Sequence, residues 1–483
     1  MGKKMILNYF LLCLFTTTAN AVPLNEILNV HILNTVKVRT ARLDYVNSRM
    51  AYENYRKSFL PSVRFGISPL SFNRSLRLLQ NPLSGDYSYV NDYSNTSSAD
   101  VTVTQRIGVL GGTLTASSGL GYLREFSYNR NSFSTSPLFI GYSQPLRGGR
   151  REYVYTRNIE RMRFVLARKR YAVAFAEERQ ALASLYMSLF VAQTLYSNAV
   201  KNVEICDTLL ALTKLKLENG QITRYDYTQI EMQRLDAAIE LERQRHTLED
   251  ARLDLCAELG VDSITVEDVH LAEMPAKMSL GEVKRIVGKN NPQVLQQAFQ
   301  MEQARLERYK ARMDTRFGGS VSLTYGLNQY AETFAKAYRS PDRRQAVVVT
   351  FSIPVFQWGI NANKRRIADN GYEQTKIAVE HGGVQFWQSV SKLVAEYNMA
   401  MASYNNVLRH SEVAAEQHDM AMERYALGQI STFELTTAYR QRLQAEQGCA
   451  TARQSACNAY YSLCRVALYD FVRQCDMEDV LDI

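Results

Sequence analysis

Apolar residues recur along this chain at two spacings, and the switches between them divide it into helical and extended stretches. Helical spacing covers about 24–59 and stops at Leu60-Pro61, because Pro resists helix continuation and favours an extended residue before it. Strict alternation follows, with Val63, Phe65 and Ile67 as its first apolar positions. Alternation returns at about 101–109, 113–123 and 138–142 before Pro145. The polar stretches at about 71–99 and 126–136 are expected to be loops.

A helix of roughly 70 residues is expected between Pro145 and Asn219. Its apolar positions step by three and four without drift, which is the 3.5-residue period of a coiled coil. At about 1.5 Å per residue it would be on the order of 100 Å long. After a sharp turn, a returning helix is expected at about 224–258. The seam positions of the long helix are Leu182, Leu185, Leu189, Ala192, Tyr196, Ala199, Val203, Cys206 and Leu210.

The second half of the chain repeats this order. A helix is expected at about 279–315, strands near 321–327 and 347–353 around a loop at about 329–344, and then another long helix. Pro354 follows Pro145 by 209 positions, and Cys464 follows Cys256 by 208. A shift of 208 therefore predicts the second seam, which indicates an internal duplication. The shifted positions are Val390, Leu393, Tyr397, Ala400, Tyr404, Val407, Ser411, Ala414 and His418, and the same spacing continues to Ala421 and Tyr425.

Each long helix ends in the same kind of turn. The first is Gly220-Gln221-Ile222-Thr223 with Asp226, and the second is Gly428-Gln429-Ile430-Ser431 with Glu434. Glycine enters the left-handed helix cap without a Cβ penalty. Thr223 and Ser431 can then cap the next helix, with the acidic residue three positions later completing a capping box. Both segments are predicted to be tight helix–turn–helix tips.

The alternating segments pair apolar side chains with small or polar ones, but one chain has too few of them to close a barrel. Unpaired strand edges cost several kcal/mol per backbone group in lipid, so several copies must close a membrane barrel together. The first extended region holds four alternating segments and the second holds two. They predict six strands per copy, unless the segments at 101–109 and 113–123 form a hairpin outside the barrel wall. The short turn Leu110-Gly111-Gly112 favours six strands, since periplasmic turns of such barrels are short.

The beginning of the chain predicts export. Lys3 and Lys4 precede the apolar run Met5–Phe15, and Ala19-Asn20-Ala21 supplies a cleavage site, so residues 1–21 are expected to be a signal peptide. Later apolar runs are shorter than the roughly 20 residues of a transmembrane helix. The formal charge is +9, or +7 without the two signal-peptide lysines. Nucleic acid is not expected as a partner of an exported chain.

Basic residues crowd the stretch from Arg147 to Arg170. Three interpretations stay open: a solvated helix face, contact with lipid head-group phosphates, or a lumen that favours anions.

The sequence predicts no enzyme, metal or cofactor. Cys206, Cys256, Cys449, Cys457, Cys464 and Cys475 form no CxxC pair and are interpreted mostly as small apolar fillers on helix faces. His410 and His418 share a helix face, but His418 is better interpreted as a polar interruption of a packing seam. Motifs for a nucleophilic serine, a nucleotide-binding loop or a zinc protease are missing, so no catalytic residue is expected.

With the two tips, the duplication and the strand-to-helix passages Gln144-Pro145-Leu146 and Ile353-Pro354-Val355-Phe356, the chain resembles the TolC-like outer-membrane efflux proteins over its whole mature length. Arg316-Phe317, which stands where Leu60-Pro61 stands in the first half, departs from that pattern. The resemblance implies a mainly α-helical protein with a membrane β-barrel closed only in a homotrimer. It also implies long coiled-coil helices that form a periplasmic tube, and two internal repeats.

The expected layout is a first repeat at 22–274, with strands at about 61–145 and its tip at 220. A second repeat would cover 275–483, with strands at about 318–354 and its tip at 428. The best-known members have two strands per half, so six per copy would be a departure. The expected location is the outer membrane, with an extension into the periplasm.

The resemblance further implies a channel that works with an inner-membrane pump and a periplasmic adaptor. The two tips resemble the turns on which the adaptor docks, and the alternative is that they are helix caps only. Glu434 stands at the first acidic position of the family's periplasmic gate, although a capping role alone is nearly as well supported. Thr437 stands where a second acid is often found, which predicts a thinner ring of carboxylates. The rival function is a structural coiled coil that spans the envelope without a pore.

Overall fold

The computed structural model describes residues 22–80, 85–126, 129–267, 274–427 and 429–481. The signal peptide expected at 1–21 and Gly428 lie outside these ranges. The chain divides into two compact units. The tip unit, as we name it, comprises residues 1–45, 167–292 and 384–483, and the sheet unit comprises residues 46–166 and 293–383. The long helices run through both units, and the limits predicted for the two repeats stay a prediction.

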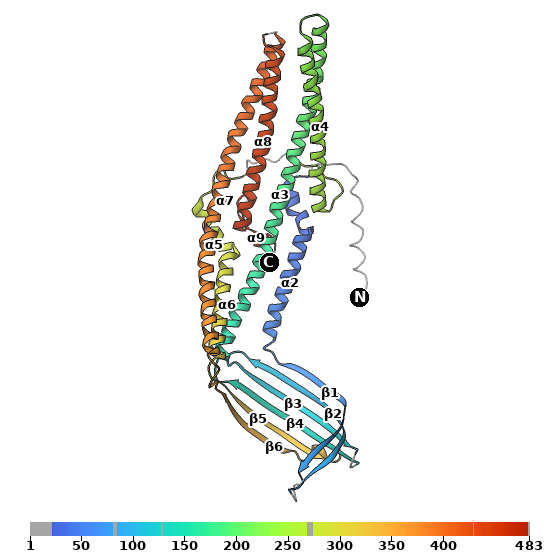
Figure 1. Ribbon diagram of the computed structural model, residues 1–483, viewed down its shortest axis with the longest axis vertical. Coiled ribbons are helices and arrows are strands. Elements are labelled where there is room, and N and C mark those ends of the chain that lie inside the picture. Colours follow the sequence, from blue (N-terminus) through green and yellow to red (C-terminus); the bar gives the residue numbers. More distant parts are fainter. Residues whose placement is uncertain (1–21, 81–84, 127–128, 268–273, 428, 482–483) are drawn as a thin grey trace, which may run out of the picture. The chain divides into compact units, whose positions relative to one another are not determined.

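The sheet unit contains a six-stranded antiparallel sheet in which every strand pairs with its neighbours in the sequence, in the order β1-β2-β3-β4-β5-β6 (Figure 1). The strands predicted near 101–109 and 113–123 are inner strands of this sheet. They are bonded to β1 on one side and to β4 on the other, so the alternative of a separate hairpin is wrong. The strands are β1 (Ser62–Gln80), β2 (Tyr87–Ile107), β3 (Gly112–Glu125), β4 (Arg130–Pro145), β5 (Gly318–Ala331) and β6 (Asp342–Ser352).

The loops expected at 71–99 and 126–136 are mostly strand, so these two predictions are wrong. β1 and β2 continue as a paired ladder from Ser71↔Thr96 to Gln80↔Tyr87. The polar composition of this segment led to the prediction of a loop, although Tyr87, Tyr89 and Tyr93 are spaced by even numbers of residues, as side chains on one face of a strand are. Backbone pairing across the ladder satisfies the main chain whatever the side chains are. The loop expected at 329–344 is largely correct, with the short 3₁₀ helix η3 (Lys336–Tyr338) inside it.

Two long helical hairpins form the largest elements, as predicted (Figure 1). The first consists of α3 (Gly149–Glu218, 70 residues) and α4 (Arg224–Leu259, 36 residues). The second consists of α7 (Ile360–Ala426, 67 residues) and α8 (Thr432–Ala467, 36 residues). Their matched lengths are those of an internal duplication. Every position of the two predicted seams is buried or half-buried, which confirms the 3.5-residue pattern.

The remaining helices are shorter than the pattern predicted. The helix expected at 24–59 is broken into α1 (Leu24–Asn29), the 3₁₀ helix η1 (His31–Asn34) and α2 (Val36–Lys57). Thr35 is extended at the break, and its hydroxyl donates to the Ile32 carbonyl. The helix expected at 279–315 is split into α5 (Leu280–Asn290) and α6 (Pro292–Asp314). Asn291 is extended there, as a residue before proline prefers to be.

The main core lies in the tip unit, where α3, α7 and α8 contribute fully buried side chains such as Leu182, Tyr186, Tyr397 and Tyr460. The C-terminal segment completes it with a small hairpin, β7 (Tyr469–Asp470) and β8 (Cys475–Asp476), and the helix α9 (Met477–Val480). None of the helices in the described residues is long and apolar enough to cross a membrane.

Candidate functional site: the strand wall and the helix tips

The register of the sheet places one apolar side chain after another across most of its width. Val63 lies opposite Val103, Val103 opposite Ala116, and Ala116 opposite Ile140. Ile140 then lies opposite Tyr325. Directly opposed residues of antiparallel strands share a face, so these side chains form one apolar face. The same face carries Phe65, Ile67, Leu114, Leu323, Val347, Val349 and Phe351.

The opposite face is rich in hydroxyl groups and glycine. Its next row runs from Ser62 through Thr104, Thr115 and Gly141 to Thr324. The large residues of the apolar face are exposed in the single chain: Val63 and Val347 are each 70% exposed. A single-layer sheet with one apolar and one small, polar face suits a wall between lipid and water.

All strand-to-helix passages lie at one end of the sheet, which we name the helix edge. Antiparallel order brings the starts of β1, β3 and β5 and the ends of β2, β4 and β6 to this edge. The β2–β3 turn lies tightly against the start of α3: a Cβ on Gly111 (φ +73°) would come within 2.5 Å of the Gly149 backbone. Gln144 Nε2 also donates to the Leu110 carbonyl, at 2.7 Å. The β2–β3 turn is therefore packed against the start of α3 and hydrogen-bonded to the end of β4.

The first helix tip has the predicted geometry. Gly220 adopts φ +70°, and Gln221 N–H donates back to the Lys216 carbonyl at 2.9 Å. Thr223 is the N-cap of α4 and makes a reciprocal capping box with Asp226. The hydrogen bond from the Thr223 hydroxyl and then that from its backbone N–H hold the pKa of Asp226 below its usual value. Ile222 lies between Gly220 and Thr223 and is half-buried in the turn.

The second tip repeats the capping box with Ser431 and Glu434. Ser431 N–H donates to Glu434 Oε2 at 2.7 Å, and this bond, followed by that from the Ser431 hydroxyl, lowers the pKa of Glu434. The Gln429 N–H donates to the Arg424 carbonyl at 2.9 Å, as its counterpart does in the first tip. Ile430 is half-buried in this turn. The capping role of Glu434 is thus present, and its gate role stays a prediction.

Thr437, the other predicted gate residue, lies one turn into α8. Its hydroxyl donates to the Phe433 carbonyl of the same helix at 2.8 Å. It carries no charge, so only Glu434 contributes a carboxylate at the two predicted gate positions.

The basic stretch from Arg147 to Arg170 has two parts that differ in their partners. Near its end, Arg168 and Lys169 both pair with Glu478, at 2.9 and 3.1 Å. Near its beginning, Arg150 and Arg151 are exposed and have no ion-pair partner among the described residues. The structure therefore pairs the later part with a carboxylate of the same chain and leaves Arg150 and Arg151 exposed in the single chain.

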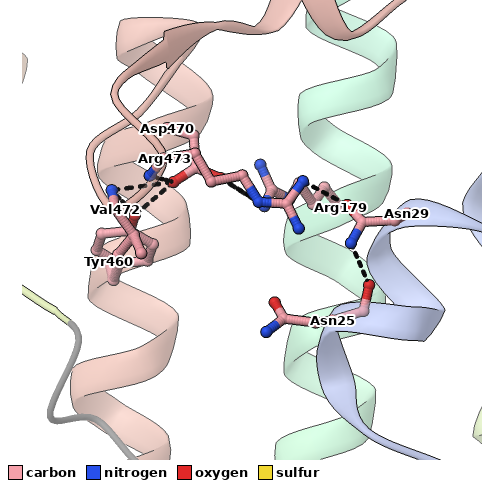
Figure 2. Close-up of polar contacts among 7 residues, drawn as sticks. All are labelled: Asn25, Asn29, Arg179, Tyr460, Asp470, Val472 and Arg473. Carbon is pink, nitrogen blue, oxygen red and sulfur yellow. Dashed lines mark hydrogen bonds and ion pairs between the residues drawn. The ribbon is translucent and has the colours of Figure 1, made fainter.

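A buried network that the sequence did not reveal fastens the C-terminal hairpin to α3 (Figure 2). Arg179 Nη2 donates to Asp470 Oδ2 at 2.6 Å, and the two side chains are 7% and 3% exposed. The Tyr460 hydroxyl donates to Asp470 Oδ1 at 2.9 Å, and the N–H groups of Val472 and Arg473 donate to the same atom. Arg473 also donates to Asn29 of the α1 segment, at 2.8 Å.

The charge of Asp470 is maintained by these donors. Burial by itself raises the pKa of this carboxyl, but the Arg179 guanidinium and the hydrogen bonds from Arg179, Arg473 and Tyr460 outweigh it. The net pKa lies below its usual value, so Asp470 is ionised at neutral pH. Arg179 and Asp470 lie 291 residues apart in the sequence, and no local motif announces their pairing.

The six cysteines of the described residues are free, and five of them are buried. Burial raises the pKa of Cys457 to about 12, as expected for a thiol that packs as a small apolar group. His418 Nδ1 lies 3.1 Å from Asp419 and 3.2 Å from Arg442, and its ring contacts Tyr439. It therefore serves as a polar member of the seam, as interpreted from the sequence.

Residues 287–467 match the family model described as "Outer membrane efflux protein". The match runs from α5 to the end of α8 and so contains the second hairpin. No curated protein sequence matches the chain.

Solved structures of a membrane protein and of outer-membrane channels have a similar fold over most of the chain. A membrane protein from Pseudomonas aeruginosa aligns with a TM-score of 0.66 at 13% identity, over 92% of this chain and 90% of that chain. The CmeC outer membrane channel of Campylobacter jejuni aligns at 0.65 and 14% identity, over 92% and 85%. The MtrE outer membrane channel of Neisseria gonorrhoeae, in its open state, aligns at 0.60 and 15%, over 92% and 88%. The predicted resemblance to TolC-like channels and the mainly α-helical fold are confirmed.

Proposed function

We propose that this chain is an outer-membrane efflux channel. Three copies would close one barrel, and the helical hairpins would extend into the periplasm. The observation that carries the proposal is the register of the sheet, which aligns apolar side chains on one face and small polar ones on the other. β6 has 11 residues, and a tilted strand crosses a bilayer with about 9–11 residues.

The two outer strands of the sheet argue for assembly. β1 and β6 each pair on one side only, since they are the ends of the strand order. Because unpaired backbone groups are costly in lipid, β6 of one copy would pair with β1 of the next. Three six-stranded sheets would give a barrel of eighteen strands. Barrels of about 16–18 strands enclose a water-filled channel.

The two tips support a partnership. Both tips have a capping box of the same kind, and Thr223 and Ser431 are exposed in both, which suits a partner that binds the two tips alike. We assign them to a periplasmic adaptor that links the channel to an inner-membrane pump. Glu434 and Thr437 would border the periplasmic opening at the second tip.

Single-channel recording of the purified protein in planar bilayers tests the pore. Stable conductance steps are expected from a trimer. A protein that inserts but never conducts would instead be a structural coiled coil of the envelope, the rival function.

Disulfide cross-linking tests the closure in the same preparation. Val63→Cys, at the helix edge of β1, combined with Val347→Cys, Val349→Cys or Phe351→Cys on β6, should give covalent trimers under oxidation. The matched control combines Val63→Cys with Val103→Cys, which face each other within one chain and should give monomers only. Failure of all three β1–β6 pairs to link copies would contradict the closed trimer.

A further inference from the structure

The helix edge of the sheet carries exposed positive charge that the channel function does not explain. We define the basic collar as Arg150, Arg151, Arg316, Lys364, Arg365 and Arg366. All six are exposed, and all lie in the sheet unit. Arg150 and Arg151 begin α3, Arg316 lies between α6 and β5, and the other three lie in the first two turns of α7.

The side chains of this collar are not paired with carboxylates. Among the described residues, none of the six has an ion-pair partner, and only Arg365 makes a hydrogen bond, to the Asn361 carbonyl of its own helix at 3.3 Å. Of the nearby acids, Glu152 pairs with Lys310, and Asp369 pairs with Arg308 and Arg312. Glu307 and Asp314 are exposed and line one pocket with Lys364, without forming an ion pair. The six basic side chains of the collar therefore outnumber these two unpaired carboxylates.

An exposed apolar segment accompanies the collar. Ile353 and Val355 continue the alternation of the apolar face of β6 and are 66% and 89% exposed. Phe356 and Trp358 follow, with their rings 4.8 Å apart, and Trp358 is 85% exposed. Trp358 has φ +48°, which a bulky residue adopts only at a cost. We name residues Ile353, Val355, Phe356 and Trp358 the aromatic anchor.

We propose that the basic collar binds the phosphate groups of anionic phospholipids, while the aromatic anchor enters the same leaflet. This inference rests on the proposed function, because it takes the apolar face of the sheet to face lipid. Where that face ends, the surroundings change from acyl chains to head groups, and tryptophan favours this depth. Lysine and arginine there attract anionic lipid, and they do so less at high salt.

The chain has two tryptophans, Trp358 and Trp387, which makes a local test possible. Trp387→Phe leaves Trp358 as the only tryptophan. The full-length variant is reconstituted in mixed phosphatidylglycerol and phosphatidylcholine vesicles, with bromine on the acyl chains of one lipid or the other. Bromine quenches tryptophan only at close range, so the ratio of the two quenching signals reports which lipid surrounds Trp358.

Stronger quenching by brominated phosphatidylglycerol is expected at equal mole fractions, with enrichment of roughly fivefold for each collar charge engaged. Lys364→Gln, Arg365→Gln and Arg366→Gln, introduced one, two and three at a time, should lower the ratio stepwise toward one. The matched control replaces Arg339, Arg343 and Arg344 with Gln. These residues are exposed at the other end of β6 and its loop, and their loss should leave the ratio unchanged.

Two results would overturn the inference. Equal quenching by both lipids in the parent would show that the collar does not select the head group. Absence of quenching would show that another surface, such as a second copy of the chain, covers Trp358. Conductance is measured on the same preparation, because it tests the channel function separately. A trimer that conducts but shows no lipid preference would contradict lipid binding by the collar and leave the proposed channel function intact.

Discussion

At the scale of single residues, the Arg179–Asp470 pair shows how the fold tolerates buried charge. Both side chains are nearly inaccessible to water, and each oxygen of the carboxylate accepts at least one hydrogen bond in Figure 2. A buried pair of this kind adds little over a well-packed apolar pair, but removal of one partner leaves an uncompensated charge. The network therefore positions the C-terminal hairpin on α3 more than it adds net stability.

Asp470→Asn should destabilise the tip unit by about 3–5 kcal/mol, because Arg179 stays buried without its counter-charge. Denaturant unfolding followed by circular dichroism in detergent measures the loss. The matched control is Glu412→Gln, whose partner Arg409 is on the surface and whose loss should cost about 0–1 kcal/mol. A double variant with Arg179→Met should recover part of the stability. Equal effects of the two single variants would contradict the buried-charge argument.

The pH dependence of this effect has a definite sign. The pKa of Asp470 is lowered in the folded state from an ordinary value of 3.8. Its contribution is therefore complete above about pH 4 and is lost as pH falls through the lower, folded-state pKa. The stability difference between the parent and Asp470→Asn should be constant from pH 8 to 5 and should shrink only below about pH 4. A difference that already disappears near pH 6 would contradict the assignment.

At the scale of elements, the first helical hairpin depends on a short turn whose conformation is fixed by Gly220 and by the capping box of Thr223 and Asp226. Gly220 has open space around it, since nothing lies within 4 Å of the position that a Cβ would take, and the same is true of Gly260 at the end of α4. Their φ angles are +70° and +68°. The two sites would thus impose the same backbone strain on a substituted residue, although only Gly220 lies at a tip.

Gly220→Arg should abolish export while insertion into the outer membrane continues, because it changes the predicted docking surface. Gly260→Arg carries the matching backbone strain, about 1–2 kcal/mol, and should keep export. Efflux assays in cells, together with quantification of the trimer in outer-membrane fractions, measure both effects. Normal export by Gly220→Arg, or equal losses in the two variants, would count against docking at the first tip.

At the scale of the whole molecule, the six strands decide how wide a closed barrel can be. β2 and β3 are inner strands of the sheet, so they belong to any wall that β1 and β4 form. Thr115 and Ala116 are neighbours on β3 and lie on opposite faces of the sheet, opposite Gly141 and Ile140 respectively. Labelling the two positions can therefore show which face meets water and which meets lipid.

Thr115→Cys should react with a water-soluble thiol reagent in the inserted trimer, and Ala116→Cys should be protected by lipid. Leu110→Cys, in the exposed β2–β3 turn, should react from the periplasmic side only. Leu110 suits this test better than the neighbouring Gly112, where a Cβ would come within 2.7 Å of the side-chain oxygens of Tyr142 and Gln144. Labelling of Leu110→Cys from outside intact cells would reject a wall of six strands per copy.

The sequence by itself determined the periodic features of this protein. Heptad seams, glycine caps and capping boxes depend on residues within one or two helical turns, so the long helices, both tips and the duplication could be predicted. Alternation likewise predicted the six strands, since side chains of a strand point to opposite faces in turn. The same local signals identified the resemblance to outer-membrane channels.

Only the tertiary structure decided the features that depend on residues far apart in the chain. Pairing across the β1–β2 hairpin made strands of a polar stretch that composition assigned to a loop, because backbone hydrogen bonds do not depend on side-chain polarity. Arg179 meets Asp470 only after α3 and the C-terminal hairpin pack together. The basic collar arises in the same way, since antiparallel order brings separate strand ends to a single edge, where their charges add.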